Sequence, residues 1–159
     1  MKNYLIFSFL LTLTLLILNT NSLAQRDSVS GKEVTGTFRL AFTGKYKGSS
    51  SDILIQALGG GKIKIGFDLI YPYTMSNGDL MANVGQLVVE AKIRGDKAVY
   101  STNETDGKCE ITVHFVKPGV IEVTQEQEGA ACGFGMNVTA KGTYKKVSSA
   151  KPNFSKIIQ

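Results

Sequence analysis

Residues 59–70 read GGGKIKIGFDLI, and this stretch decides the fold class. After the three glycines, the apolar residues Ile63, Ile65, Phe67 and Leu69 alternate with polar or small residues. A period of two residues is typical of a β-strand with one buried face. Consecutive glycines supply the positive φ angles that a tight hairpin turn requires. The stretch therefore predicts a turn followed by a half-buried strand.

The same alternation recurs in segment after segment beyond residue 25, whereas helical periodicity is almost absent. Each segment has one apolar and one polar face, as a half-buried strand requires. No helical segment is available to cover a sheet edge. The unpaired N–H and C=O groups of the edge strands are therefore best satisfied if the sheet closes into a ring. We therefore predict an all-β fold, a single eight-stranded antiparallel up-and-down barrel, with strands at residues 34–42, 52–58, 62–70, 85–94, 97–101, 109–116, 120–124 and 136–145.

Short and long connections alternate between the predicted strands. Tight turns are expected at residues 59–61, 95–96 and 117–119, and longer links at 43–51, 71–84, 102–108 and 125–135. In an up-and-down barrel every second connection lies at the same end, so the long links should share one rim. Binding residues favour loops on a rigid scaffold, which makes this rim the predicted functional surface.

The predicted rim combines aromatic and charged side chains. Five of its eight charged residues are acidic, although the protein as a whole is positive, and an acidic patch attracts a cationic partner. Alternatively, the tyrosines only cap the barrel and the charges are solvated. The candidate partner-binding residues are Tyr46, Lys47, Tyr71, Tyr73, Asp79, Glu126 and Glu128, with Lys45, Met75, Glu104, Asp106, Lys108 and Phe134 beside them.

The first 24 residues have the features of a cleavable signal peptide. Lys2 precedes an apolar run over residues 4–18, and a small-residue ending leads to Ala24. The run is shorter than the ~20 residues that span a bilayer, and no cluster of Lys or Arg follows it. We expect cleavage after Ala24, export to the periplasm or the extracellular space, and a mature chain that does not span a membrane.

The expected organisation is a signal peptide at residues 1–24, an N-terminal segment at 25–33, the barrel at 34–146 and a flexible polar tail at 147–159. Cys109 and Cys132, the two cysteines of the chain, both fall at the long-link end of the barrel. Export favours a disulfide between them, which contributes roughly 3 kcal/mol. Two buried thiols are the alternative reading.

Catalytic and nucleic-acid-binding functions find little support in the residues. The exported part has a formal charge of +4, because Lys2 is the only charged residue of the signal peptide, but it contains no Lys/Arg run typical of nucleic-acid binding. His114, the single histidine, falls on an outward strand face, where a solvated side chain is favoured over a general base. No ligand spacing indicates a metal site, and we expect no cofactor.

Residues 132–144 read CGFGMNVTAKGTY, which resembles a C-terminal pattern of small exported bacterial proteins of poorly defined function. The layout of signal peptide, eight-stranded barrel and late disulfide is also similar to the bacterial inhibitors of c-type lysozyme. That family inserts a Ser-Gly-x-x-Tyr loop and a Tyr-x-x-x-Thr-Lys-Gly segment into the lysozyme cleft. The nearest stretches here are residues 46–50, YKGSS, in a different order, and residues 139–142, TAKG, with one extra residue. The resemblance implies a lysozyme as a candidate partner.

These observations predict an exported, non-catalytic binding protein that acts through loops at one barrel rim, in the manner of a lysozyme inhibitor. The alternative is a lipocalin-like carrier of a small apolar ligand, which is a comparison at the level of the fold. Interior volume separates the two, because a small barrel filled by large side chains has no room for a ligand. The expected filling residues are Phe38, Phe42, Phe67, Phe115 and Tyr144. An enzyme with an unfamiliar site is the third possibility.

Overall fold

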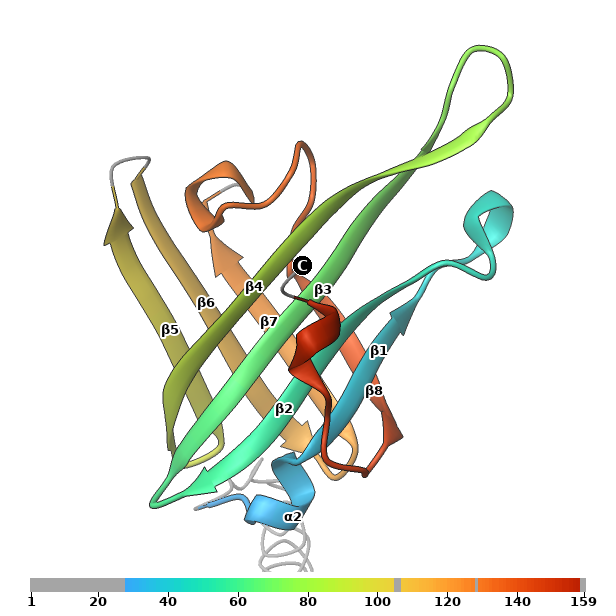
Figure 1. Ribbon diagram of the computed structural model, residues 1–159. Helices are drawn as coiled ribbons and strands as arrows, with labels where there is room; N and C mark the ends of the chain where they lie inside the picture. The colour runs from blue at the N-terminus through green and yellow to red at the C-terminus, as the bar shows by residue number, and fades with distance from the viewer. Residues whose placement is uncertain (1–27, 105–106, 128, 158–159) are drawn as a thin grey trace, which may run out of the picture.

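The computed structural model describes residues 28–104, 107–127 and 129–157. Eight antiparallel strands follow one another in up-and-down order, and β1 pairs with β8 so that the ring closes (Figure 1). The predicted barrel is confirmed, whereas the predicted signal peptide lies outside the described residues. The strands are β1 Gly36–Ala41, β2 Ser50–Gly59, β3 Lys62–Thr74, β4 Leu80–Arg94, β5 Lys97–Glu104, β6 Gly107–Lys117, β7 Val120–Glu126 and β8 Gly142–Ser148.

The inward side of the alternating strands fills the barrel. Ile63, Ile65, Phe67 and Leu69 of β3 are at most 1% exposed, and the other large buried side chains include Phe38, Phe115 and Tyr144. Burying a side chain of this size contributes roughly 1.5–3 kcal/mol, so the interior positions supply much of the folding free energy. Phe42 differs from our expectation, because it lies past the end of β1 and is only half-buried.

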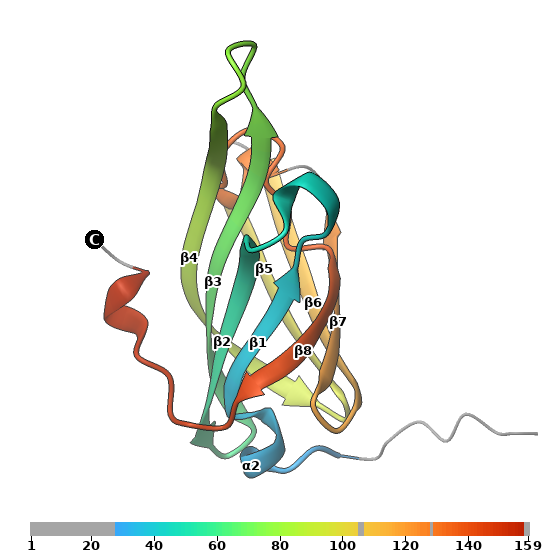
Figure 2. The ribbon, with the colours of Figure 1, turned by 90° about the vertical axis from the view of Figure 1, so that its right-hand side faces the viewer.

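The two ends of the barrel differ (Figures 1 and 2). One end, the turn end, has the predicted tight turns between β2 and β3, β4 and β5, and β6 and β7. The short helix α2 (Gly31–Val34) packs there, and Lys146 Nζ holds it by donating to the carbonyl oxygens of Glu33 and Thr35. The other four connections share the opposite end, which we call the rim. The prediction that every second connection lies at the same end is therefore confirmed.

Two of the predicted long links are mostly strand. β3 and β4 stay paired as far as Thr74 and Leu80, so residues 71–84 are a loop only at 75–79. The β5–β6 hairpin likewise stays paired as far as Glu104 and Gly107. The first of these extensions is hard to predict from the sequence, because it contains Pro72 and proline is uncommon inside a strand. Pro72 is tolerated because the missing N–H faces the side of β3 that β2 has already left.

The last strand begins later than predicted. β8 starts at Gly142, whereas the alternation predicted a strand from residue 136. Asn137 has a φ of 62°, a left-handed conformation that interrupts a strand, and the preceding Met136 is 76% exposed. Val138 and Ala140 are buried, but they belong to the connection between β7 and β8 and not to the barrel wall.

The C-terminal segment, which we expected to be a loose tail, packs against the outside of the barrel. It runs past β2 and β3 and ends in the short helix η4 (Phe154–Lys156) (Figure 1). Phe154 and Ile157 are 9% and 3% exposed. A Cβ at Gly66 would lie 2.5 Å from Ile157 Cδ1, so the missing side chain of Gly66 makes room for this contact. Two apolar anchors in a polar segment were too weak a signal to predict it.

Candidate functional site

The β3–β4 hairpin continues beyond the barrel as a two-stranded ribbon, defined here as residues 71–83. β2 stops pairing with β3 at Asp68, and Ser51 Oγ then accepts a hydrogen bond from the Ile70 N–H at 3.0 Å. Past this point β3 is paired to β4 alone. The ribbon rises past the ends of the other strands in both views (Figures 1 and 2). It is the part of the rim that projects furthest from the barrel.

The tip of the ribbon is a turn with its own hydrogen bonds. The Met75 N–H donates to the Asp79 carbonyl oxygen at 2.9 Å, and the Gly78 N–H donates to the Met75 carbonyl oxygen at 3.0 Å. Asn77 Oδ1 accepts from the Asp79 N–H at 3.1 Å, while its Nδ2 donates to the Asp79 carboxylate at 2.6 Å. The candidate residue Asp79 is therefore exposed at the tip and held by Asn77.

Large apolar side chains are exposed on both faces of the ribbon and at its base. Strand alternation places Tyr71, Tyr73 and Met81 on the face that continues the barrel interior, with Tyr73 directly opposite Met81. Leu80 and Val84 point to the other face and are 54% and 59% exposed. Clustered apolar exposure on a protein surface marks an interaction site. The structure thus brings two predicted tyrosines together with three residues that the sequence did not single out.

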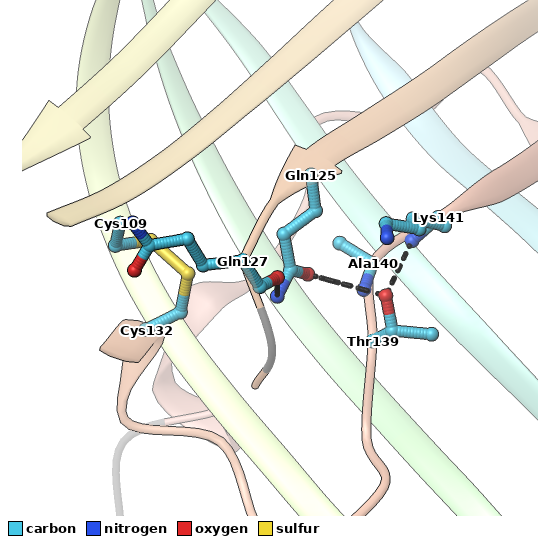
Figure 3. Close-up of a disulfide and its surroundings, with 7 residues drawn as sticks. All are labelled: Cys109, Gln125, Gln127, Cys132, Thr139, Ala140 and Lys141. Carbon is cyan, nitrogen blue, oxygen red and sulfur yellow. Dashed lines mark hydrogen bonds between the residues drawn. A yellow bond between two sulfur atoms is a disulfide. The ribbon is translucent and has the colours of Figure 1, made fainter. Parts of the chain in front are cut away.

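The connection between β7 and β8 folds into the rim, and we call its residues 129–141 the plug. The predicted disulfide is confirmed: Cys109 of β6 is joined to Cys132 of the short helix η3 (Gly129–Cys132), with Cα atoms 5.0 Å apart. Both half-cystines are buried. Figure 3 shows the disulfide on one side of the plug and Gln125 beside the other. The covalent bond attaches the first turn of the plug to the barrel wall.

Gln125, at the end of β7 and 4% exposed, forms hydrogen bonds with Ala140 and Thr139 of the plug and with Gln127 just before it. Its Oε1 accepts from the Ala140 N–H at 2.8 Å and from Thr139 Oγ1 at 3.4 Å, while its Nε2 donates to the Gln127 carbonyl oxygen at 3.2 Å (Figure 3). The Tyr144 hydroxyl donates to the Ala140 carbonyl oxygen at 3.0 Å, and burial raises the pKa of this tyrosine, which keeps it a neutral donor. Pairing of these buried groups makes the plug a defined part of the fold.

The plug also binds the base of the ribbon. The Gly135 N–H donates to the Val84 carbonyl oxygen at 3.0 Å, and Asn83 Nδ2 donates to the Met136 carbonyl oxygen at 2.7 Å. Phe134 differs from our expectation of a rim contact, because it is 5% exposed and its ring lies 6.3 Å from that of Phe67. Met136 remains exposed beside the ribbon. We use the name apolar rim for Tyr71, Tyr73, Met75, Leu80, Met81, Val84 and Met136.

Only some of the acidic residues that we predicted for the rim lie in the described part of the chain. Asp106 and Glu128 lie outside the described residues, and the Glu104 side chain is likewise not described. Figure 1 shows the ribbon tip, where Asp79 lies, well separated from the end of β7, where Glu126 is exposed. The structure therefore does not bring these two candidate residues together.

A neighbouring lysine partly offsets the acidic groups of β6 and β7. Glu126 lies directly opposite Glu110, and Lys108 Nζ is 2.7 Å from the Glu110 carboxylate. The hydrogen bond from Lys108 to Glu110 raises the pKa of the lysine, and Glu126 adds to this effect. The carboxylate of Glu126 thus has a cation close by.

Tyr46 and Lys47 lie in the connection between β1 and β2, where the short helix η2 (Gly44–Tyr46) forms. Tyr46 is half-buried, Lys47 is exposed, and Lys45 Nζ lies 4.8 Å from the centre of the Tyr46 ring. This distance allows a cation–π contact. Both candidate residues are at the rim, but on a different connection from the ribbon (Figure 1).

His114 is paired rather than simply solvated, which differs from our expectation. Its Nε2 lies 3.0 Å from the Asp96 carboxylate at the turn end, and the Asp96 side chain is 7% exposed. The hydrogen bond from His114 lowers the pKa of Asp96, although burial acts in the other direction. Oδ1 of Asp96 is buried without a partner in the described part of the chain. The pair links the β4–β5 turn to β6.

No group of three or more His, Cys, Asp or Glu side chains in the described residues could hold a metal ion. No helix within that same part is long and apolar enough to cross a bilayer. Comparisons of the chain with models of protein families, with curated proteins and with solved structures found no match in any of the three sets.

Proposed function

We propose that this chain is an exported, non-catalytic protein that binds a partner protein through its rim. The main supporting observation is the apolar rim, in which Tyr71, Met75, Leu80, Met81, Val84 and Met136 are between 42% and 76% exposed. Leaving such side chains in water forgoes the free energy that their burial would provide. A partner that covers them recovers it.

Two features support the export and the rigid presentation that this proposal requires. A disulfide is typical of proteins that fold in an oxidising compartment, in agreement with the predicted signal peptide. The same disulfide and Gln125 fix the plug, and the plug fixes the base of the ribbon through Gly135 and Asn83. A surface held in place before binding loses less conformational entropy when a partner arrives.

The filled interior argues against the lipocalin-like alternative. Phe38, Phe67, Phe115 and Tyr144 are at most 2% exposed and occupy the centre of the barrel. A cavity of about 300 Å³ lies beside α2 at the turn end, lined by Val29, Val34, Ile63 and the glycines of the β2–β3 turn. Its lining comes from α2, the β2–β3 turn and the adjoining strand ends, whereas the alternative function would place its ligand at the centre of the barrel, which these four side chains occupy.

A cationic protein, with c-type lysozyme as the concrete case, is the partner we propose first. Asp79 is exposed at the ribbon tip and supplies negative charge beside Met75 and Leu80 of the apolar rim. A charged periphery around an apolar centre is the usual composition of a protein interface, and it also speeds the encounter with a partner of opposite charge.

The test is a calorimetric titration of residues 25–159, with the disulfide formed, against purified c-type lysozyme, accompanied by a lysis assay. We expect binding and a loss of lytic activity. The double variant Tyr71→Ser/Met81→Ser should bind at least about tenfold more weakly, as interface anchors do when truncated. The control Leu58→Ser/Val147→Ser removes exposed apolar side chains away from the rim and should bind as the unchanged protein does. No binding at micromolar concentrations would overturn the choice of lysozyme, and equal binding by both variants would overturn the rim as the site.

A further inference from the structure

A second surface, distinct from the rim, lies where β4 and β5 separate. The two strands pair only through Lys92 and Val99, Ile93 and Ala98, and Arg94 and Lys97. β4 nevertheless continues to Leu80 on the β3 side, and β5 continues to Glu104 on the β6 side. Figure 1 shows the two strands diverging above their shared turn. We call this region, from Gln86 to Arg94 on β4 and from Lys97 to Ser101 on β5, the seam.

Main-chain groups of β4 are left without a strand partner along the seam. Alternate residues of a strand direct their N–H and C=O groups to opposite sides. The Ile93 N–H donates to the Gly61 carbonyl oxygen on the β3 side. The N–H and C=O groups of Lys92, and of every second residue before it, therefore point toward the seam. Lys92 is paired with Val99, and the Val84 carbonyl oxygen is taken by Gly135. Three edge positions lie between Val84 and Lys92 and form no pair with β5: Gln86, Val88 and Glu90.

Two adjoining clefts follow the seam on the outer surface. One, of about 400 Å³, is lined by Lys62, Glu90, Ala91, Lys92, Val99, Tyr100 and Ser101. The other, of about 320 Å³, is lined by Lys92, Arg94, Lys97 and Val99. Val99, which is shared by both clefts, is 48% exposed. The groove therefore adjoins the open strand edge at Glu90 and exposes one apolar side chain, Val99, between its charged residues.

The charge of the groove is strongly positive. Lys62 lies directly opposite Lys92, and Arg94 directly opposite Lys97, against the single carboxylate of Glu90. None of these four cations forms an ion pair with a carboxylate of the described residues. Like charges facing each other across a strand pair destabilise a sheet. An anionic occupant would remove that repulsion.

We propose that the seam binds an acidic, extended peptide segment, which adds to the open edge of β4 as an extra strand. The peptide main chain pairs with Gln86, Val88 and Glu90, and its carboxylates meet Lys62, Lys92 and Arg94. Strand addition takes its affinity from main-chain hydrogen bonds and its specificity from the side chains beside the edge. Here that specificity is for negative charge. The site uses neither the ribbon nor the plug, so it goes beyond the function proposed above.

The test is an NMR titration of residues 25–159 with an acetylated and amidated octapeptide that alternates Val and Glu. We expect the amide protons of Gln86, Val88 and Glu90 to gain protection from exchange, which a purely electrostatic contact would not produce. Lys92→Glu should weaken binding at least about tenfold, because it places like charges together. The matched control Lys145→Glu, an exposed lysine of β8, and the rim variant Tyr71→Ser/Met81→Ser should bind the peptide unchanged.

Two results would overturn the proposal. Equal binding of the peptide to Lys92→Glu and Lys145→Glu would show that the seam is not its site. Binding that depends on Lys92, but is matched by a sulfated polysaccharide and leaves the exchange of the three edge amides unchanged, would reassign the seam to anionic polymers.

Discussion

At the scale of single residues, Gln125 determines whether the plug stays in place. The plug is not paired with β7 as a strand. Its contact with β7 is made by the buried side chain of Gln125, which forms hydrogen bonds with Ala140, Thr139 and Gln127. Nothing in the sequence around Gln125 distinguished it from the exposed polar residues of β7. Its role depends on where the chain returns after residue 135, and local alternation contains no information about that return.

Gln125→Ala should lower the free energy of unfolding by about 1–3 kcal/mol, because the buried Ala140 N–H loses its acceptor. Urea unfolding followed by circular dichroism measures the change. Gln86→Ala is the control: Gln86 is an exposed glutamine with one hydrogen bond, to Asp68, and its loss should cost no more than about 0.5 kcal/mol. Similar losses in both variants would contradict the role assigned to Gln125.

The Asp96 and His114 pair predicts a pH dependence of stability. The pKa of Asp96 is lowered from its ordinary value of 3.8 in the folded protein, so folding favours the ionised carboxylate. The resulting stabilisation is present above that ordinary value and is lost as the pH falls through the lowered pKa. Asp96→Asn should therefore be less stable than the unchanged protein near neutral pH, and the difference should shrink in acid.

Unfolding free energies of Asp96→Asn and the unchanged protein, measured by urea at about pH 7 and at about pH 2, check this expectation. Glu90→Gln, which neutralises an exposed carboxylate on the neighbouring strand, is the control for a general effect of charge. A difference for Asp96→Asn that is the same at both pH values would contradict the direction of the shift.

At the scale of elements, the disulfide fixes the plug against the barrel. Cys109 and Cys132 are 23 positions apart, and removing the disulfide in Cys109→Ala/Cys132→Ala should lower the free energy of unfolding by about 3 kcal/mol. The loss should appear first as faster hydrogen exchange in the plug, while the buried strand β3 keeps its protection. Exchange measured by mass spectrometry separates this outcome from a uniform loss of protection, which would show that the disulfide stabilises the barrel as a whole.

The strands differ in how well the sequence predicts them. β3 and β6 alternate without interruption, and their positions were predicted to within a few residues. β8 was misplaced, because Met136, Val138 and Ala140 imitate an inward-facing set, whereas two of them are buried in the plug and the third is exposed. Alternation reports which residues are buried, but it does not report what buries them.

At the scale of the whole molecule, the up-and-down order and the common end of the long connections could be predicted from alternation and turn chemistry. The ribbon could not, because Pro72 and the short polar stretch at 76–79 have the composition of a loop. The packing of Phe154 and Ile157 against Gly66 is a contact between distant segments, and single-sequence patterns do not encode such contacts. The candidate tyrosines and Met75 could be placed at the rim from the sequence, whereas Leu80, Met81, Val84 and Met136 beside them could not.

Hydrogen exchange of residues 25–159 in the presence and absence of c-type lysozyme tests the rim as a binding surface most directly. We predict that protection increases in the ribbon and the plug, residues 71–83 and 129–141, and does not change at the turn end, residues 59–62 and 117–120. Protection confined to the turn end or spread evenly over the barrel would contradict the assignment of the rim as the binding surface.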